Sequence, residues 1–430
     1  MKQVWILNHY AIEPGSAGIT RHFDLAVNLR KHGWQATVIA ASVEHITGRQ
    51  RLEPHEKRRC ESYSHVPFLW VRTPEYRGNG MRRVLNMLTY TWRVVMPGCT
   101  AGLSKPDVVI GSSVHPLAAV AALLLARRHR VPFVFEVRDL WPQTLVDFGK
   151  LSERSPVTWA LRRLERWLYR SAVRIVAPLP YAADYISALG ISRDKVVWIP
   201  NGVDLSATST SSESVDASAR NEVQSKPESP FVLMYFGAHG LANGLSPLIH
   251  AMKLVAGEAG SEAIKLRMIG SGALKEELQR LANTLNLTNI SFEPPVPKST
   301  IPQLAAQADG FVITVLGLPQ LYRYGISMNK LFDYFAAARP VVIACNAANN
   351  PVLEAGAGIT VPPDDPQELA RAIIALYRMP PEERQRMGAA GRRYVEENHD
   401  TNRLAARLAS TLNACSISTP TRETVRSLRS

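Results

Sequence analysis

The chain has few cysteines and no long hydrophobic run. Its four cysteines, at positions 60, 99, 345 and 415, lie far apart in a sequence of 430 residues. This spacing forms neither a metal-binding pattern nor a disulfide framework, so a reducing cytoplasm is the expected compartment. No apolar stretch approaches the ~20 residues that a membrane-spanning helix needs. We therefore expect a cytoplasmic protein, and the cysteines indicate no metal.

The sequence also lacks the G-x-G-x-x-G fingerprint of dinucleotide-binding folds. The turn after the first expected strand carries only Gly15 and Gly18, followed by Arg21 in the next helix. Two glycines let the backbone approach a ligand, but their spacing does not favour a nicotinamide cofactor. A ligand-binding loop and a plain turn between strand and helix both fit this segment.

The charge of the chain is strongly unbalanced. Fifty lysines and arginines against 37 acidic residues give a formal net charge of +13, which favours an anionic partner. Residues 81–93 and 155–170 interleave arginine with tryptophan and leucine, a pattern typical of segments that bind anionic lipid at a bilayer surface. Helices that pack on a core and expose their arginines share this pattern. No nucleic-acid-binding module is evident, so we expect no nucleic-acid partner.

Strand and helix patterns alternate along most of the chain, which predicts doubly wound parallel sheets in an α/β protein. The Ser- and Glu-rich stretch 206–230 is nearly free of large apolar residues and is predicted to be a flexible linker. It divides a Rossmann-like domain at 1–205 from a second one at 231–400. A helix at 401–415 is predicted to cross back to the first domain, and 416–430 is predicted to be a disordered tail.

The segment from Tyr324 to Ala344 is the most informative part of the chain. It predicts a loop, a helix that begins near Asn329 and Lys330, and a buried strand. Unpaired N–H groups at a helix start suit a phosphate, and the lysine adds a full positive charge there. We therefore predict a phosphate site at this helix start. A helix with a solvated lysine is the alternative.

Glycine-rich turns follow the first two strands of the second domain. One contains Gly237, His239 and Gly240, and the other contains Gly270 and Gly272. Without side chains, such turns let the backbone approach a nucleotide closely. Each turn alone is a weak signal. Their repetition at successive strand ends, together with the lysine-bearing helix start, favours a nucleotide site.

Charged residues also follow a buried strand of the first domain. Glu136, Arg138 and Asp139 stand just past an apolar run, and His115 stands near the end of the preceding strand. In open parallel sheets, ligands bind beyond the carboxyl ends of the strands. These side chains are predicted to face a cleft between the two domains. A salt-bridged loop is the alternative.

Taken together, these motifs resemble family 4 glycosyltransferases, which are retaining enzymes with the two-domain GT-B fold. The resemblance covers residues 1–412. It rests on four motifs, at residues 136–142, 200–204, 325–334 and 358–366. Within the family, the chain is most similar to the bacterial subgroup that builds O-antigen or capsule repeats, including N-acetyl-L-fucosamine transferases. The resemblance implies two Rossmann-like domains that face each other across a cleft.

The resemblance implies that the second domain binds a nucleotide sugar, with UDP as the favoured nucleotide. It implies that the first domain binds an acceptor, without a metal or other cofactor. It assigns donor contacts to Gly237, His239, Gly240, Gly270, Gly272, Asn329, Lys330 and Asp333. It assigns acceptor contacts to Gly15, Gly18, Arg21 and His115. It assigns the reaction itself to Glu136, Arg138, Asp139 and Lys330.

Three departures from the family pattern bear on mechanism. The usual pair of glutamates falls on Gly325 and Asp333, so the first carboxylate is missing. The usual basic pair after the first strand of the donor domain is replaced by His239 and Asn243. A histidine common at one first-domain strand end is Arg138. Lys330 then supplies positive charge for the diphosphate.

The expected reaction is transfer of an N-acetylated amino or deoxyamino sugar to a hydroxyl of a lipid-linked saccharide, with retention. A front-face route is preferred, and a double displacement through Glu136 or Asp139 stays open. The product would serve bacterial surface polysaccharides at the inner face of the cytoplasmic membrane. Alternatives are a UDP-amino-sugar 2-epimerase on the same fold and a non-catalytic subunit of a polysaccharide assembly complex.

Overall fold

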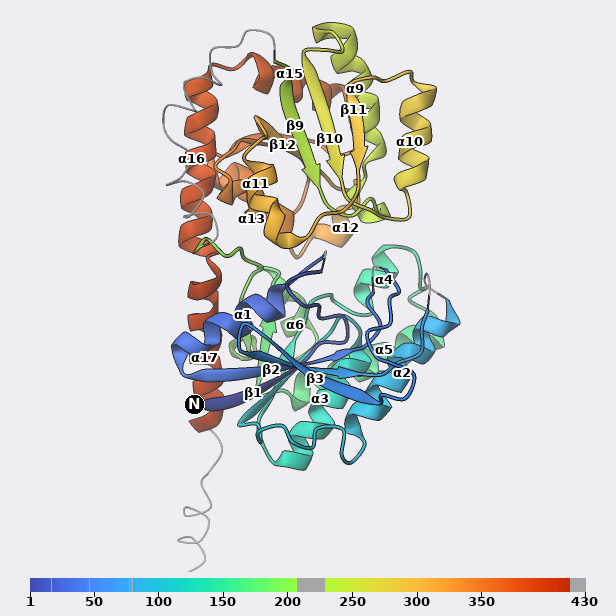
Figure 1. The fold of residues 1–430 in the computed structure, drawn as a ribbon, viewed down its shortest axis with the longest axis vertical. Coiled ribbons are helices and arrows are strands. Elements are labelled where there is room, and N and C mark those ends of the chain that lie inside the picture. The colour runs from blue at the N-terminus through green and yellow to red at the C-terminus, as the bar shows by residue number, and fades with distance from the viewer. Residues whose placement is uncertain (17, 46, 77, 79, 207–228, 418–430) are drawn as a thin grey trace, which may run out of the picture. The chain divides into compact units, whose positions relative to one another are not determined.

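The computed structural model describes residues 1–206 and 229–417, except 17, 46, 77 and 79. The described chain forms two compact units (Figure 1). Residues 1–200 and 401–417 belong to the first, and residues 201–206 and 229–400 belong to the second. The division at Pro200 precedes the expected boundary at 205, because Val203 and Leu205 are buried in the core of the second unit. Most of the predicted linker, 207–228, and of the predicted tail, 418–430, lies outside the described residues.

The first unit is built on an eight-stranded sheet. Its strand order is β3-β4-β2-β1-β5-β6-β7-β8, and every neighbouring pair except β3–β4 is parallel. The strands are β1 (Lys2–Leu7), β2 (Trp34–Ala41), β3 (Arg58–Tyr63), β4 (Val66–Val71), β5 (Val108–Ser112), β6 (Phe133–Glu136), β7 (Arg174–Ala177) and β8 (Val196–Trp198). The central strands are fully buried, as runs of Val and Ile covered on both faces should be.

The antiparallel edge strand β3 departs from the predicted all-parallel sheet. It forms a hairpin with β4 through Ser64 and His65, whose φ values are 47° and 64°. Turns of this kind usually use Gly or Asn, so the sequence carried no strong signal for them. The charged, half-exposed residues of β3 suit an edge strand, which must avoid pairing with other chains.

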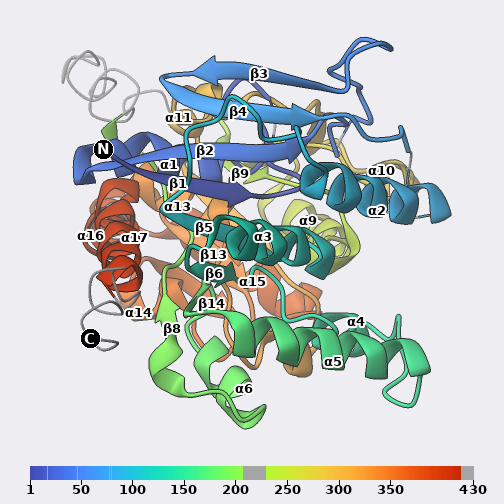
Figure 2. The ribbon, with the colours of Figure 1, turned by 90° about the horizontal axis from the view of Figure 1, so that it is seen from below.

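Helices cover both faces of this sheet. Helix α1 (Arg21–Leu29) packs on α17 (Thr401–Ile417), so the last helix of the chain belongs to the first unit. That helix runs past the expected end at 415. Helices α2 (Met81–Val95), α3 (Pro116–His129) and α5 (Pro156–Ser171) lie side by side, with α3 in the middle (Figure 2). The short helices are α4 (Gln143–Asp147) and α6 (Ala182–Ala188).

The second unit has a six-stranded, fully parallel sheet in the order β11-β10-β9-β12-β13-β14. Its strands are β9 (Phe231–Phe236), β10 (Ile264–Ile269), β11 (Ile290–Glu293), β12 (Gly310–Thr314), β13 (Val341–Ala344) and β14 (Gly358–Val361). Its helices are α9 (Ser246–Ala259), α10 (Lys275–Thr284), α11 (Ile301–Ala305), α12 (Pro319–Tyr322), α13 (Asn329–Ala336), α14 (Pro351–Ala355), α15 (Pro366–Arg378) and α16 (Pro381–Asn398).

Two apolar cores stabilise this sheet. One contains buried residues of helices α9 and α15, and the other contains buried residues of helix α13. Asp365 begins α15 as predicted, because its side chain accepts hydrogen bonds from the N–H groups of Gln367 and Glu368. Within the described residues, each helix is too short or too polar to cross a bilayer.

Candidate functional site

The turns that follow β9 and β10 lie directly against each other at the carboxyl edge of the second sheet. A methyl group built on Gly270 would lie 2.0 Å from the carbonyl oxygen of Gly237. Both glycines have φ near +149°, a conformation that residues with side chains rarely adopt. A side chain on Gly270 is therefore excluded on two grounds. The result is an edge of bare backbone, as the glycine pattern predicted.

His239 joins the two turns. Its N–H donates to the carbonyl oxygen of Ser271 at 2.8 Å, and a methyl group on Gly272 would lie 2.5 Å from its carbonyl oxygen. The imidazole is fully buried, and neither ring nitrogen has a hydrogen-bond partner among the described residues. Burial, then Lys275 and Lys330, lower the pKa of His239 to about 4. It is therefore a neutral imidazole at physiological pH, with one donor and one acceptor that pair with no described residue.

Lys330 lies at the same edge. Its Nζ donates to the hydroxyl of Tyr235 at 2.8 Å and to Oδ1 of Asn243 at 2.6 Å, and it lies 4.4 Å from the centre of the Tyr235 ring. A methyl group on Gly237 would lie 3.2 Å from this Nζ, so the lysine directly adjoins the first glycine turn. Neither of these two hydrogen-bond partners is a carboxylate. Burial lowers the pKa of Lys330 to about 7.

Helix α13 begins at Asn329, and no side chain caps its first turn. Its open N–H groups and the Lys330 ammonium therefore lie at one place, which suits a phosphate. The preceding loop is held by Asn201, whose N–H donates to Ser327 Oγ at 3.0 Å and whose Nδ2 donates to the Ser327 carbonyl at 2.6 Å. This contact explains how the motif at 200–204 supports the site.

Two predicted donor residues have other surroundings. Asp333 forms an ion pair with Lys298, with Nζ 2.5 Å from Oδ1, so its carboxylate is already compensated. Gly240 makes no close backbone approach, because a methyl group there would come no nearer than 4.0 Å to Asn243. Sequence reasoning passed over Tyr235 and Lys298. Tyr235 could have been identified from the sequence as a candidate site residue, because it is the one residue with a polar hydroxyl in an otherwise apolar strand.

In the first unit, Glu136 does not face outward from the sheet edge. Only 3% of it is exposed, and it accepts hydrogen bonds from Arg21 Nε at 2.9 Å and His22 Nε2 at 2.5 Å. Burial alone would raise the pKa of Glu136, but His22 and Arg21 outweigh that effect and hold it well below its ordinary range. The carboxylate is thus the centre of a closed internal network.

Arg21 is also committed to this network. Its Nη2 donates to the Ile199 carbonyl at 2.8 Å and its Nη1 to the Pro200 carbonyl, and 5% of the residue is exposed. The polar groups of Arg21 and Glu136 are therefore paired inside the domain, and contact of either residue with a substrate stays a prediction. Glu136 thus forms the ion pairs that the salt-bridge alternative expects.

Four other predicted residues of the first unit are at least partly exposed. Arg138 is partly exposed and donates its N–H to Ser113 Oγ at 3.1 Å, and Asp139 is exposed. Gly15 and Gly18 lie in an exposed loop before α1. A methyl group on Gly15 would have no neighbour within 4 Å, so the structure gives no close-approach reason for that glycine.

His115 is the residue before α3 and is 1% exposed, against the ring of His9. His9 and Tyr10 follow the end of β1 and were not predicted as site residues. Their signal was available, because polar aromatic residues directly after a buried strand lie at the ligand-binding edge of an open sheet.

Comparison with known proteins identifies a glycosyltransferase family. Residues 17–202 match the family model described as "Glycosyl transferase 4-like domain", and residues 230–379 match "Glycosyl transferases group 1". A probable glycosyltransferase of Pseudomonas aeruginosa, WbjE, is 23% identical over 319 residues, which is 70% of this chain and 72% of WbjE.

Solved structures with the same fold include sucrose-phosphate synthase from Thermosynechococcus elongatus. Its TM-score is 0.73 at 15% identity, over 97% of this chain and 100% of that one. Anabaena HepE in complex with UDP and glucose has a TM-score of 0.66 at 18% identity, over 96% and 100% of the two chains. The two family models together match most of the chain, one in each half, and the chain belongs to the glycosyltransferases of the GT-B fold.

Proposed function

We propose that the chain transfers a sugar from a UDP-sugar donor that binds at the carboxyl edge of the second sheet. The observation that carries the proposal is the meeting of bare backbone at Gly237 and Gly270 with Lys330 at the uncapped start of α13. HepE, of the same fold, was solved with UDP-glucose, which supports a uridine nucleotide. The resemblance to the fucosamine subgroup favours an N-acetylated amino or deoxyamino sugar.

The leaving diphosphate is the group that needs stabilisation in this reaction. A protonated Lys330 and the first N–H groups of α13 provide preorganised donors for its developing charge, so no metal need do so. Neutral His239 adds one hydrogen-bond donor at the same edge. We propose a front-face reaction with retention, in which the departing phosphate takes the proton of the attacking hydroxyl. The burial of Glu136 argues against that residue as a covalent nucleophile.

We propose that the acceptor is a lipid-linked saccharide at a membrane surface, used for bacterial surface polysaccharide. The support is an apolar and basic surface, defined as the outward faces of α2 and α5. On α2, Leu88 and Trp92 are 50% and 61% exposed, and on α5, Trp159 is 67% exposed. Apolar groups this exposed, interleaved with arginine, suit the boundary between headgroups and acyl chains.

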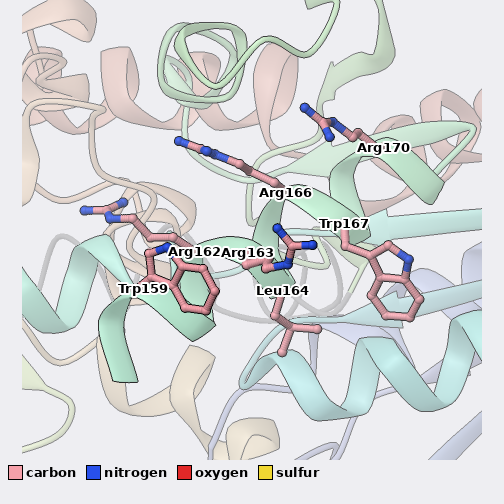
Figure 3. Close-up of a pocket in the computed structure, with 7 residues that line it drawn as sticks. All are labelled: Trp159, Arg162, Arg163, Leu164, Arg166, Trp167 and Arg170. Carbon is pink, nitrogen blue, oxygen red and sulfur yellow. The ribbon is translucent and has the colours of Figure 1, made fainter. Parts of the chain in front are cut away.

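Figure 3 shows the α5 part of this surface. Trp159, Leu164 and Trp167 line a groove together with four arginines, at 162, 163, 166 and 170. Arg127 of α3 lies over the Trp167 ring at 5.4 Å, so α3 joins the surface. Among the described residues that line the groove there is no carboxylate, and Glu153 pairs with Arg162 from outside the lining. The excess of arginine favours an anionic partner.

The donor proposal is tested by incubating purified protein with UDP-sugars and a lipid-linked saccharide and measuring UDP release. The Lys330→Ala variant should lose most transfer while keeping its thermal midpoint. Lys253→Ala, an exposed lysine on α9, is the matched control and should behave as wild type. Near-normal turnover of Lys330→Ala would refute the assignment. If the protein converts a UDP-amino sugar without acceptor, the epimerase alternative is favoured. If no donor gives UDP release, the non-catalytic subunit is favoured.

The membrane proposal is tested by sedimentation with vesicles containing phosphatidylglycerol. Wild type should sediment at low salt and be released at high salt, because arginine contacts with lipid are screened. Trp159→Ala combined with Trp92→Ala should bind several-fold less. Leu353→Ala, which removes an apolar side chain 70% exposed in the second unit, should bind as wild type. Equal sedimentation of the double variant would refute the surface.

A further inference from the structure

A buried histidine, His399, lies next to the point where the chain leaves the second unit. The chain passes from one unit to the other after Pro200 and again after Asp400. His399 directly follows helix α16 and is 2% exposed. Its carbonyl oxygen accepts a hydrogen bond from the N–H of Val203 at 3.0 Å, and Val203 pairs with Asp400 in a parallel bridge. The main chain of His399 thus joins the two segments that lead to the other unit.

The imidazole of His399 holds the main chain of Asn201. Its Nδ1 lies 2.8 Å from the Asn201 carbonyl oxygen. Because a carbonyl oxygen only accepts, Nδ1 carries the proton and is the donor. Asn201 is 4% exposed, and a buried carbonyl group without a partner is costly. The hydrogen bond therefore fixes both the tautomer of His399 and the position of Asn201.

The face of the same ring packs on helix α13. The rings of His399 and Phe332 stack with their centres 3.7 Å apart and their planes 19° apart. Phe332 is the fourth residue of α13 and is 1% exposed. Stacked rings prefer a defined mutual orientation, so this contact restrains the helix as well as filling the core.

Asn201 carries the restraint on to the loop before α13. Its N–H and its side-chain Nδ2 both donate to Ser327, at 3.0 and 2.6 Å. Ser327 stands two residues before Asn329, where α13 begins. His399 therefore reaches the start of α13 by two routes. One passes through Asn201 to the loop, and the other passes through Phe332 to the helix itself.

Histidine suits this place because it combines a flat ring with a polar N–H. A phenylalanine would stack on Phe332 but would remove the donor to the Asn201 carbonyl. An asparagine would keep a donor but would leave the face of Phe332 without a stacked ring. A residue that only filled the core would need no N–H at all. The two contacts together favour a role in fixing Asn201 and α13 relative to each other.

We propose that His399 is a positioning residue for the donor diphosphate. Through Asn201 and Phe332 it sets the place of the Ser327 loop and of the first N–H groups of α13, without touching the nucleotide. The inference rests on the proposed function, because it takes the diphosphate to bind at that helix start. Donors that recognise a ligand must be held to about 0.5 Å, so a loosened loop should weaken the phosphate contacts.

The test compares UDP with uridine, which lacks the phosphates. The Kd of UDP is measured by calorimetry and that of uridine by NMR titration, both on full-length protein. His399→Phe keeps the ring and removes the N–H, so it should raise the Kd of UDP about tenfold and leave the Kd of uridine unchanged. His250→Ala, at an exposed histidine on α9 of the same unit, should bind both ligands as wild type does.

A second control separates positioning from general destabilisation. Ile373 is fully buried in the other apolar core of this unit. Ile373→Val should lower the thermal midpoint and leave the Kd of UDP at the wild-type value. The route through Asn201 is tested in a background of Asn201→Ala with Ser327→Ala, which removes both hydrogen bonds to the loop. There, adding His399→Phe should cost no further UDP affinity, because the link is already broken.

Two measurements decide the matter if His399→Phe fails to fold. Ser327→Ala removes one hydroxyl and should weaken UDP several-fold but not uridine. In wild type, the ring ¹⁵N resonances of His399 should show a protonated Nδ1 and should shift when UDP is added. Wild-type UDP affinity in His399→Phe or Ser327→Ala, equal losses for UDP and uridine, an undiminished loss in the double-variant background, or unshifted resonances would overturn the proposal. Failure of the donor proposal looks different, because wild type would then not bind UDP.

Discussion

Binding of UDP should be coupled to proton uptake by Lys330. In the free protein, burial holds the pKa of this lysine to about 7. A bound diphosphate would favour the charged form and raise that pKa toward or above its ordinary value of about 10.4. At pH 7 about half a proton should be taken up per UDP, and at pH 8.5 about one. Apparent affinity should fall about fifty-fold between pH 7 and pH 9, because neutral lysine must be protonated before it can pair.

The assay is isothermal titration calorimetry with UDP, at each pH in two buffers that differ in ionisation enthalpy. The window begins at pH 7 because the terminal phosphate of UDP itself titrates near pH 6. Lys330→Met should remove the proton uptake and most of the affinity, and Lys253→Ala should retain both. Affinity that is constant from pH 7 to pH 9, without proton uptake, would refute the placement of Lys330 at the diphosphate.

Four further variants test the supporting structure. Glu136→Ala should lower the free energy of unfolding by about 3–5 kcal/mol in urea titrations, because it leaves buried partners uncompensated. The pKa of Glu136 is lowered in the folded protein. Its contribution to stability is therefore present above pH ~4.3 and is lost as the pH falls below that value. Glu136→Gln should for this reason make the free energy of unfolding depend less on pH in the acid range. Gly270→Ala should abolish the thermal shift with UDP, because its methyl group would displace the carbonyl of Gly237. Asn201→Ala should weaken UDP binding about tenfold, since it frees the loop at Ser327, and a Kd equal to that of wild type would contradict this role.

Much of the fold was predictable because its signals are local. Buried strands such as β5 and β12 are apolar runs separated by amphipathic helices, and this alternation dictates a parallel sheet. The β3–β4 hairpin was missed because its turn uses Ser64 and His65 where glycine or asparagine is usual. The first domain was expected to extend to residue 205, because in sequence its last strand leads directly on to Leu205. Its burial depends on a core formed by strands far along the chain.

The site was predictable in its positions and less so in its roles. Residues at the carboxyl ends of parallel strands can be identified from the chain, and Gly237, Gly270 and Lys330 do lie together there. The sequence alone cannot show which polar side chains pair with one another inside the fold. Glu136 and Arg21 are 115 positions apart, and only the folded register brings them within 2.9 Å. The same limit hid the ion pair that occupies Asp333.

Buried polar groups in this protein therefore fall into two kinds, those that are paired inside the fold and those that have no partner among the described residues. Glu136 has every partner that it needs and stabilises the fold. His239 and His115 are buried without partners in the described chain, and each lies near a cation, Lys330 in one unit and Arg83 in the other. Burying a polar group without a hydrogen bond costs about 1–3 kcal/mol, a cost that a ligand can remove. Both sheets thus hold a buried, neutral imidazole near a positive charge at their carboxyl edges.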